Sequence, residues 1–233
     1  CSSAGAVYIF TRSGTTWTTP PETGSAGDPH LTFANGGSAD FRGANGAIFA
    51  FLSAPGIGAN VLTESRDFGR WGGQLVHGSF ITHIFLKLRS LHTGDVVRVA
   101  IVANQFNSFQ VHRSDDTLTQ YVNRTRLEQD GIAVLQLQSG RTSIKAAGWE
   151  VFINRRWLRK PLVGKPLVAD SLEHWFLDAK YRVLDGDADD VKLFGPSTVG
   201  RIAPHGIIGQ SFDGSQISVS GKHDDYGNGP EFT

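Results

Sequence analysis

The chain has 233 residues with 22 acidic and 22 basic side chains, so its formal net charge is zero. This balance excludes the basic excess that is typical of nucleic-acid or anionic-membrane binding. No apolar run approaches the roughly 20 residues that a membrane-spanning helix needs. A single cysteine, Cys1, excludes disulfides within the chain. The missing initiator Met and signal peptide predict a mature form or an excised fragment.

Residues 1–18 are predicted to form a β-hairpin. Residues 6–10 are a strand-like apolar run, residues 12–14 suit a turn, and residues 15–17 suit a return strand. This hairpin resembles the blade unit of FG-GAP repeats, which build integrin-type β-propellers from several blades. An ordinary terminal hairpin that pairs with the rest of the protein is the alternative. The Pro, Gly and Ser content of residues 19–26 predicts a linker.

The next segment has the most distinctive pattern. The Asp28-Pro29 step cannot lie inside a helix, because proline removes a backbone donor and restricts the residue before it. Residues 31–33 then suit a strand, and residues 35–37 (Asn-Gly-Gly) suit a tight turn. The return strand is expected to begin at Asp40 and to continue to Leu52, paired with residues 31–33. The expected core aromatic residues are Phe33, Phe41, Phe49, Phe51 and Trp149.

Strand-like segments then follow one another at regular intervals, separated by turn signals rich in Gly, Asp and Ser. They cover residues 60–65, 75–88, 96–102, 109–112, 132–137 and 149–153. One helix candidate, at residues 170–175, is short. Short strands at such regular spacing predict an all-β fold, a large antiparallel β-sandwich or barrel with little helix.

Two motifs carry a resemblance to a known family. The Gly27-Asp28-Pro29-His30 opening, followed by the D-F-x-G element at residues 40–43, resembles the first hairpin of von Willebrand factor type D domains. Near the other end, the HGxxGQ sequence of residues 205–210 is similar to relatives in which the family's cysteine is replaced. These relatives are the plant root-cap proteins and the C-terminal domain of inter-alpha-trypsin inhibitor heavy chains.

The resemblance implies a single type D-like β domain over residues 27–233, in a protein located outside the cell or at its surface. The residues that carry the family motifs are Gly27, Asp28, Pro29, His30, His205, Gly206 and Gly209. It also implies a calcium loop, because Phe212-Asp213-Gly214 resembles the family's F-D-G element. The expected oxygen ligands of that loop are Asp213, Asp224, Asp225 and Asn228.

A second acidic cluster is a further candidate for calcium. Asp185, Asp187 and Asp189 match the spacing that begins an EF-hand loop. The sixth position is Asp190 rather than Gly and the twelfth is Pro196 rather than Glu, which excludes an EF-hand. A looser calcium loop is still a candidate for this cluster, and a plain acidic hairpin turn is the alternative. For the loop that begins at Phe212, the alternative is a solvated acidic turn.

Other motifs are weaker. The eight histidines include no H-E-x-x-H pattern, which argues against zinc. Asn123 begins a glycosylation sequon. The basic run at residues 154–160 could contact an acidic glycan or the carboxylate of a partner. A solvated turn is the alternative interpretation and is favoured. No G-x-S-x-G nucleophile elbow or phosphate-binding glycine loop occurs.

These observations predict a non-catalytic structural, adhesion or assembly module, stabilised by calcium and part of a larger secreted or surface protein. Its expected partners are other extracellular proteins or glycans. The alternative is a carbohydrate-binding module in which exposed Trp71, Trp157 or Trp175 stacks on sugar rings. A third hypothesis is an enzyme, since some luciferases carry type D domains, but those domains are rich in cysteine and this chain is not.

Overall fold

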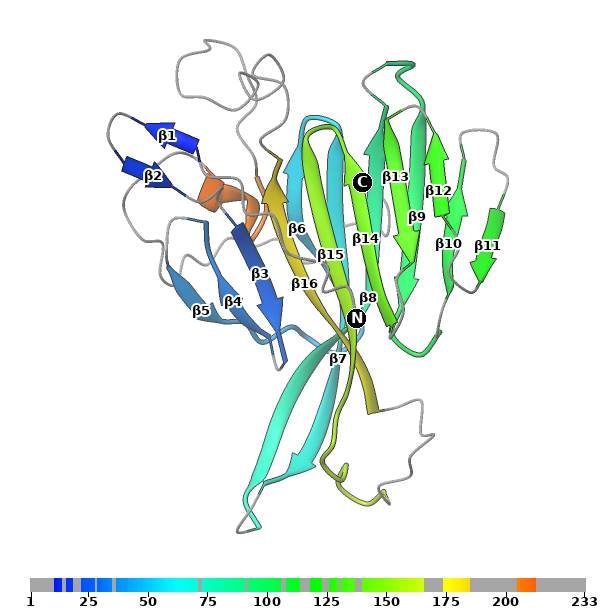
Figure 1. Ribbon diagram of the computed structural model, residues 1–233. Helices are drawn as coiled ribbons and strands as arrows, with labels where there is room; N and C mark the ends of the chain where they lie inside the picture. The colour runs from blue at the N-terminus through cyan, green and yellow to red at the C-terminus, as the bar shows by residue number, and fades with distance from the viewer. Residues whose placement is uncertain are drawn as a thin grey trace, which may run out of the picture.

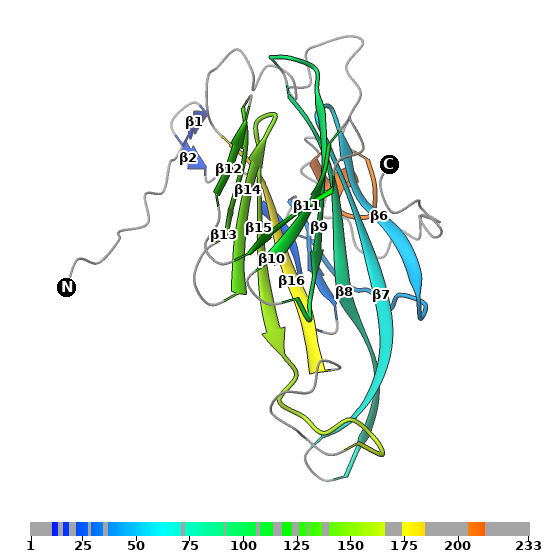
Figure 2. The same cartoon turned by 90° about the vertical axis from the view of Figure 1, so that its right-hand side faces the viewer.

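The computed structural model describes fourteen stretches of the chain: residues 11–13, 16–18, 22–27, 29–34, 37–70, 73–90, 92–105, 108–113, 118–122, 126–129, 131–136, 140–165, 174–184 and 205–212. The described part is an all-β sandwich of two antiparallel sheets, as the strand spacing predicted (Figure 1). Seen from the side, the two sheets form two facing layers (Figure 2).

One layer is a six-stranded sheet in the order β11-β10-β9-β8-β7-β6. Its strands follow each other along the chain, so every neighbouring pair is joined by one turn. Their bounds are β6 (Ala47–Ala54), β7 (Ile57–Gly69), β8 (Leu75–Arg89), β9 (Val96–Val102), β10 (Ser108–His112) and β11 (Leu118–Val122).

The other layer is an eight-stranded sheet in the order β12-β13-β14-β15-β16-β3-β4-β5. The N-terminal strands extend it beyond β16, so residues far apart in the sequence lie side by side. Their bounds are β3 (Glu22–Ala26), β4 (His30–Thr32), β5 (Ser38–Asp40), β12 (Arg126–Gln129), β13 (Ile132–Gln136), β14 (Arg141–Ala146), β15 (Trp149–Trp157) and β16 (Trp175–Val183).

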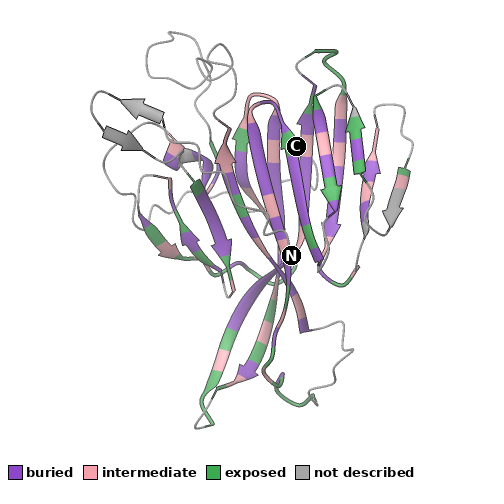
Figure 3. Cartoon of the chain, viewed as in Figure 1, coloured by how far each residue is buried: buried purple, intermediate pink, exposed green. Residues whose placement is uncertain are grey.

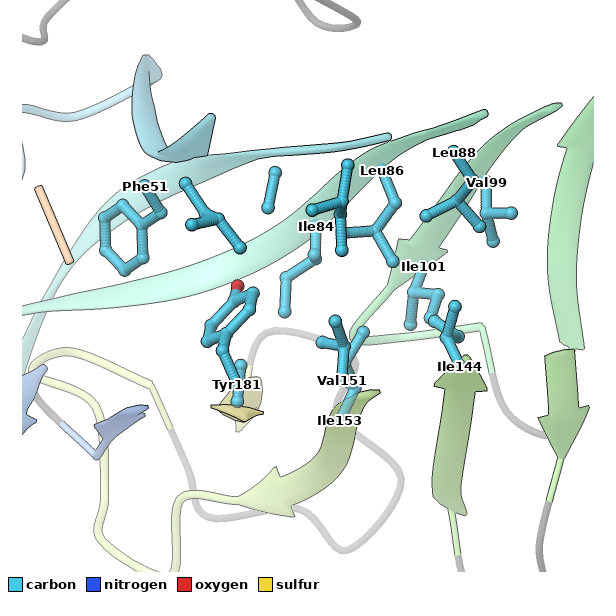
Figure 4. Close-up of a cluster of buried hydrophobic side chains, with 14 of the residues drawn as sticks. Phe51, Ile84, Leu86, Leu88, Val99, Ile101, Ile144, Val151, Ile153 and Tyr181 are labelled. Carbon is cyan, nitrogen blue, oxygen red and sulfur yellow. The ribbon is translucent and has the colours of Figure 1, made fainter. Parts of the chain in front are cut away.

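The core lies between the two layers and follows from the two-residue alternation of the strands. Apolar residues in register across β13, β14, β15 and β16 face apolar residues of β8 and β9 (Figure 4). Figure 3 shows buried residues, in purple, along the strands of both sheets. The facing sets are Val134, Ile144, Val151 and Tyr181 on one side, and Ile84, Leu86, Val99 and Ile101 on the other.

The predicted first hairpin is present, and its continuation differs from the prediction. His30 pairs with Asp40 and Thr32 pairs with Ser38 across the turn. Residues 47–54, however, form β6 and pair with β7 in the opposite sheet rather than with β4. The chain crosses between the layers at Gly43, whose amide donates to Ser79 Oγ at 3.0 Å. A Cβ atom there would lie 2.3 Å from Thr63 Oγ1, so only glycine permits this crossing.

The predicted core aromatic residues are confirmed in part. Phe33, Phe51 and Trp149 are buried. Phe41 and Phe49 are only partly buried, and they pack edge-on against each other with ring centroids 4.9 Å apart.

Three other expectations were wrong. Residues 22–26 form β3 rather than a linker, because Thr23 and Ser25 turn inward while the backbone pairs with β16 and β4. Residues 154–157 belong to β15 rather than to a turn, and Arg155 is buried. Trp175 begins β16 rather than ending a helix.

The N-terminal hairpin is present, but residues 12–13, which were predicted to form its turn, belong to a strand. Strands β1 (Thr11–Ser13) and β2 (Thr16–Thr18) pair only with each other, in a separate two-stranded sheet. Residues 6–10 lie outside the described residues, as do residues 170–173 of the helix candidate.

Candidate functional site

A cavity with a volume of about 590 Å³ lies where the β7–β8 hairpin leaves the sandwich. Strand β6 stops pairing with β7 at Thr63, and β9 stops pairing with β8 at His83. Beyond these points β7 and β8 continue as a two-stranded ribbon, which projects from the end of the sandwich (Figure 1). The cavity is lined by this ribbon, the end of β9, residues 162, 163 and 165, and Trp175.

The segment after β15 holds the walls of the cavity in place. Val163 donates a backbone hydrogen bond to Asp67 O at 2.9 Å, and Gly69 donates to Pro161 O at 3.2 Å. The segment therefore pairs with the otherwise open edge of β7. A second hydrophobic cluster fills the space behind it, formed by Phe68, Phe80, Leu158, Leu162 and Phe176.

Arg66 is the most constrained polar residue of the cavity. Its Nη1 donates to Trp175 O at 2.7 Å, and its Nη2 lies 3.0 Å from Glu64 Oε2. The Arg66 side chain is only 10% exposed, whereas that of Glu64 is 40% exposed. Arg66 therefore joins β7 to β16, and Glu64 and the half-buried Trp175 both line the cavity.

The remaining polar groups of the wall include both donors and acceptors. Asp67 Oδ1 lies 2.9 Å from His77 Nδ1, and both side chains are about half exposed. His83 contacts Thr82 Oγ1 at 3.1 Å, and Asn104 and Lys165 are exposed at the cavity wall. The two negative charges of Glu64 and Asp67 are balanced by the two positive charges of Arg66 and Lys165.

Arg155 lies close behind this wall, inside the sandwich. Its Nε donates to the carbonyl oxygen of Val102, a residue that lines the cavity, at 3.3 Å. Burial lowers the pKa of Arg155 to about 10. Gly140 makes room for this side chain, since a Cβ atom there would lie 3.2 Å from Arg155 Cβ.

Among the described carboxylates, Asp178 of β16 is the one whose pKa is shifted. Burial raises its pKa, while the Gly27 amide, which donates to Asp178 Oδ1 at 2.9 Å, and the Arg156 guanidinium act in the opposite direction. This contact ties the start of the family-like motif to β16.

The other motif residues also have structural contacts. Pro29 is buried and its carbonyl accepts from the Phe41 amide at 2.9 Å. His30 and Asp40 form an exposed pair across the hairpin, 2.6 Å apart. Asp28 lies outside the described residues.

The C-terminal motif closes the edge of β6. His205 exchanges two backbone hydrogen bonds with Ser53, and Gly206 sits directly against Phe51 with φ at +96°. Gly209 begins the short 3₁₀ helix η3 (Gly209–Phe212), within which Ser211 Oγ accepts from the Ala34 amide at 3.1 Å. Ser211, directly after the C-terminal motif, therefore contacts Ala34 near the turn of the first hairpin.

The predicted calcium ligands all lie outside the described residues: Asp185, Asp187, Asp189, Asp213, Asp224, Asp225 and Asn228. The glycosylation candidate Asn123 and the tryptophan Trp71 lie outside them as well. Within the described stretches, no group of three or more His, Cys, Asp or Glu side chains is arranged to hold a metal ion.

Of the two described candidate tryptophans, Trp175 lines the cavity. Trp157 is its cross-strand partner and is also partly buried. Sequence reasoning missed Glu64, Arg66 and Asp67. The signal that could have found them is the run of charged residues at the end of the predicted strand 60–65. Polar residues on both faces of a strand indicate that this part of the strand extends beyond the sheet.

Fold and cavity together define a β-sandwich with a ligand-sized polar cavity. No known family model matches the chain, and no curated protein sequence matches it. In the described part of the chain, none of the helices has the length and apolar character to cross a bilayer.

Proposed function

We propose that this chain is a non-catalytic recognition module of an extracellular or cell-surface protein, and that it binds a carbohydrate in the cavity beside Trp175. The observation that carries the proposal is that Trp175 and the Arg66–Glu64 pair line one cavity, in which Arg66 donates to the Trp175 backbone carbonyl. Its volume of about 590 Å³ lies within the range of roughly 300–1,000 Å³ that is usual for small-molecule sites.

The balance of charge favours an uncharged polar ligand. An anion entering the cavity would meet the carboxylates of Glu64 and Asp67, and a cation would meet Arg66 and Lys165. Sugar hydroxyls donate and accept at once, so they can use both kinds of group without a net charge. The apolar face of a sugar ring can pack on the indole of Trp175, whose amphipathic ring suits such contacts.

The contacts of the carboxylates support binding rather than hydrolysis. A glycosidase needs one carboxylic acid and one carboxylate placed on either side of the scissile bond. Here Glu64 forms an ion pair with Arg66, and Asp67 contacts His77. Each carboxylate is therefore suited to accept hydrogen bonds from a bound ligand.

The test is a screen of the whole chain against neutral glycans, followed by calorimetry with the best ligand. Glu64→Gln should lower the affinity at least tenfold, about 1.4 kcal/mol, because a charged acceptor is lost. Glu128→Gln is the matched control, since Glu128 is an exposed partner of Arg126 on β12 in the other sheet. Its affinity should stay within twofold of the parent chain.

Trp175→Ala gives the independent check on stacking, with the thermal midpoint recorded to confirm that the variant folds. A chain that binds no glycan, or whose affinity is unchanged in both Glu64→Gln and Trp175→Ala, would contradict the proposal. Chromatography of the glycan after incubation tests the catalytic alternative, because cleaved products would show an enzyme.

A further inference from the structure

The outer face of the six-stranded sheet carries cations at directly opposed positions. Lys87 of β8 pairs in register with Arg98 of β9, and Arg98 pairs in register with His112 of β10. Their neighbours Leu86, Leu88, Val97 and Val99 are buried in the core. Because side chains alternate along a strand, Lys87 and Arg98 point away from the core.

This arrangement is an exception in the protein. At the other described positions where two charged or titratable side chains are cross-strand partners, the pairing joins opposite signs. Examples are Glu150 with Arg182, whose Oε2 and Nε lie 2.7 Å apart, and Glu150 with Lys145. Like charges placed directly opposite each other destabilise a sheet. The Lys87–Arg98 pair therefore costs stability unless an anion lies between them.

The described residues supply no acidic partner for this pair. Neither Lys87 nor Arg98 forms an ion pair with a carboxylate in the described part of the chain. Arg89, two residues beyond Lys87 on the same face, donates to the Gly94 carbonyl at 3.3 Å rather than to an acid. Three cations thus lie together on two adjacent strands, which run about 4.8 Å apart.

A hollow adjoins these cations. It has a volume of about 230 Å³ and is lined by Ser53, Gly56, Gly58, Lys87 and Arg89, among others. Gly58 lies in register between Ser53 and Lys87, so its missing side chain leaves room above the sheet. The Ser53 side chain is exposed at the far side of the hollow and can donate from its hydroxyl.

We propose that the row Ser53–Gly58–Lys87–Arg98, with Arg89 beside it, binds the sulfate groups of a sulfated glycan chain. Arginine recognises a tetrahedral oxyanion through paired N–H groups, and lysine adds a point charge. The cations follow a line across the strands, which matches a linear chain of anionic groups better than a single ion. This site is separate from the cavity beside Trp175 and does not depend on the function proposed there.

Nucleic acid is the less favoured polyanion. Proteins that bind single strands place aromatic rings where bases can stack. Among the described residues, the exposed large hydrophobic side chains include no Phe, Tyr or Trp, and Phe85, on the same face, is buried.

The experiment measures binding of a heparin hexasaccharide to the whole chain by calorimetry at low and physiological salt. The double variant Lys87→Gln/Arg98→Gln should lose at least tenfold in affinity, and the parent affinity should fall as salt screens the charges. Arg141→Gln removes one cation from an exposed position of β14 in the other sheet and is the control. It should stay within twofold of the parent chain.

Thermal unfolding provides a second measurement that also reports folding. The hexasaccharide should raise the melting midpoint of the parent chain through mass action, and it should not raise that of the double variant. Without ligand, the double variant should melt at the same temperature as the parent or higher, because the like-charge contact is gone.

Three results would overturn the proposal. One is absence of hexasaccharide binding, and another is an equal loss of affinity in Arg141→Gln and the double variant, which would mean unspecific charge attraction. The third is equal or tighter binding of a single-stranded DNA oligomer of matched charge at the same residues. Inorganic sulfate alone should bind much more weakly than the hexasaccharide, since it makes only one such contact.

Discussion

Replacing Gly206 with alanine tests whether the C-terminal motif holds the edge of β6. Gly206 has a φ of +96°, and a Cβ atom there would lie 2.6 Å from Phe51 O and 2.9 Å from Leu52 N. Both neighbours are backbone atoms of β6, so no side-chain rotation relieves the contact. Strain at such a φ costs about 1–3 kcal/mol for a residue other than glycine.

The clash adds to this strain, because the segment has to move away from β6. Four backbone hydrogen bonds join the two, exchanged by residues 205–208 and 50–53, and each contributes about 0.5–1.5 kcal/mol. Ile208 is fully buried, and exposing it costs about 1.5–3 kcal/mol. Since the segment keeps part of these contacts after relaxing, we expect Gly206→Ala to lower the free energy of unfolding by about 3–5 kcal/mol.

Equilibrium unfolding in urea, followed by tryptophan fluorescence, measures this change. Gly46→Ala is the matched control: its φ is +72°, but no atom lies within 4 Å of the added Cβ. It should cost about 1–2 kcal/mol from backbone strain alone. Equal costs for the two variants would refute the reasoning, because the close approach to β6 would then contribute nothing.

Two further predictions concern the core and calcium. Tyr181 has no hydrogen-bond partner for its buried hydroxyl among the described residues, so Tyr181→Phe should stabilise the protein by about 1 kcal/mol in the same urea assay. Burial raises the pKa of Tyr181 above its ordinary value of about 10, so the unfolded state loses this proton at a lower pH than the folded state. The free energy of unfolding therefore falls as the pH rises above about 10. Tyr181→Phe should remove this part of the alkaline loss of stability, and an unchanged pH profile would contradict the prediction. Millimolar calcium should raise the melting temperature and a chelator should lower it, and Asp213→Asn with Asp224→Asn should abolish the shift while Asp115→Asn keeps it. A melting curve that chelator leaves unmoved would rule out the calcium loops.

Local sequence patterns predicted where the strands lie but not all of their partners. The apolar runs rich in β-branched residues at 75–88 and 96–102 predicted β8 and β9. Such runs do not indicate which sheet a strand joins. Residues 47–52 were assigned to β4, the nearest strand in sequence, whereas the contact of Gly43 with Thr63 directs them to β7. That contact depends on tertiary packing and leaves no local pattern.

The candidate sites show the same limit. Trp175 could be proposed as a ligand contact from its residue type, and the structure places it in a cavity. The Arg66–Glu64 pair becomes notable only when Arg66 reaches the Trp175 carbonyl on another sheet. The cross-strand pairing of Lys87 with Arg98 likewise depends on the register of β8 and β9, and the sequence alone does not give that register.

The position of the cavity follows from unequal strand lengths. Strand β8 has 15 residues, whereas its neighbour β9 has 7. At about 3.3 Å a residue, β8 therefore extends roughly 25 Å beyond what β9 alone can pair. The projecting ribbon has open edges, which proteins cover to prevent unwanted pairing. Residues 161–163 cover one edge, and Phe68 and Leu162 pack behind it.

The covering segment meets the ribbon beyond the end of the sandwich, so a space remains between the last core layer and this second cluster. Arg66 and Trp175 line that space and join its two walls through one hydrogen bond. A shorter β7–β8 hairpin would remove the ribbon, the second cluster and the cavity together. The sandwich core at Ile84 and Leu86 lies nearer the other end of β8 and does not need the ribbon for its packing. The carbohydrate site that we propose therefore depends on this extension and not on the sandwich core.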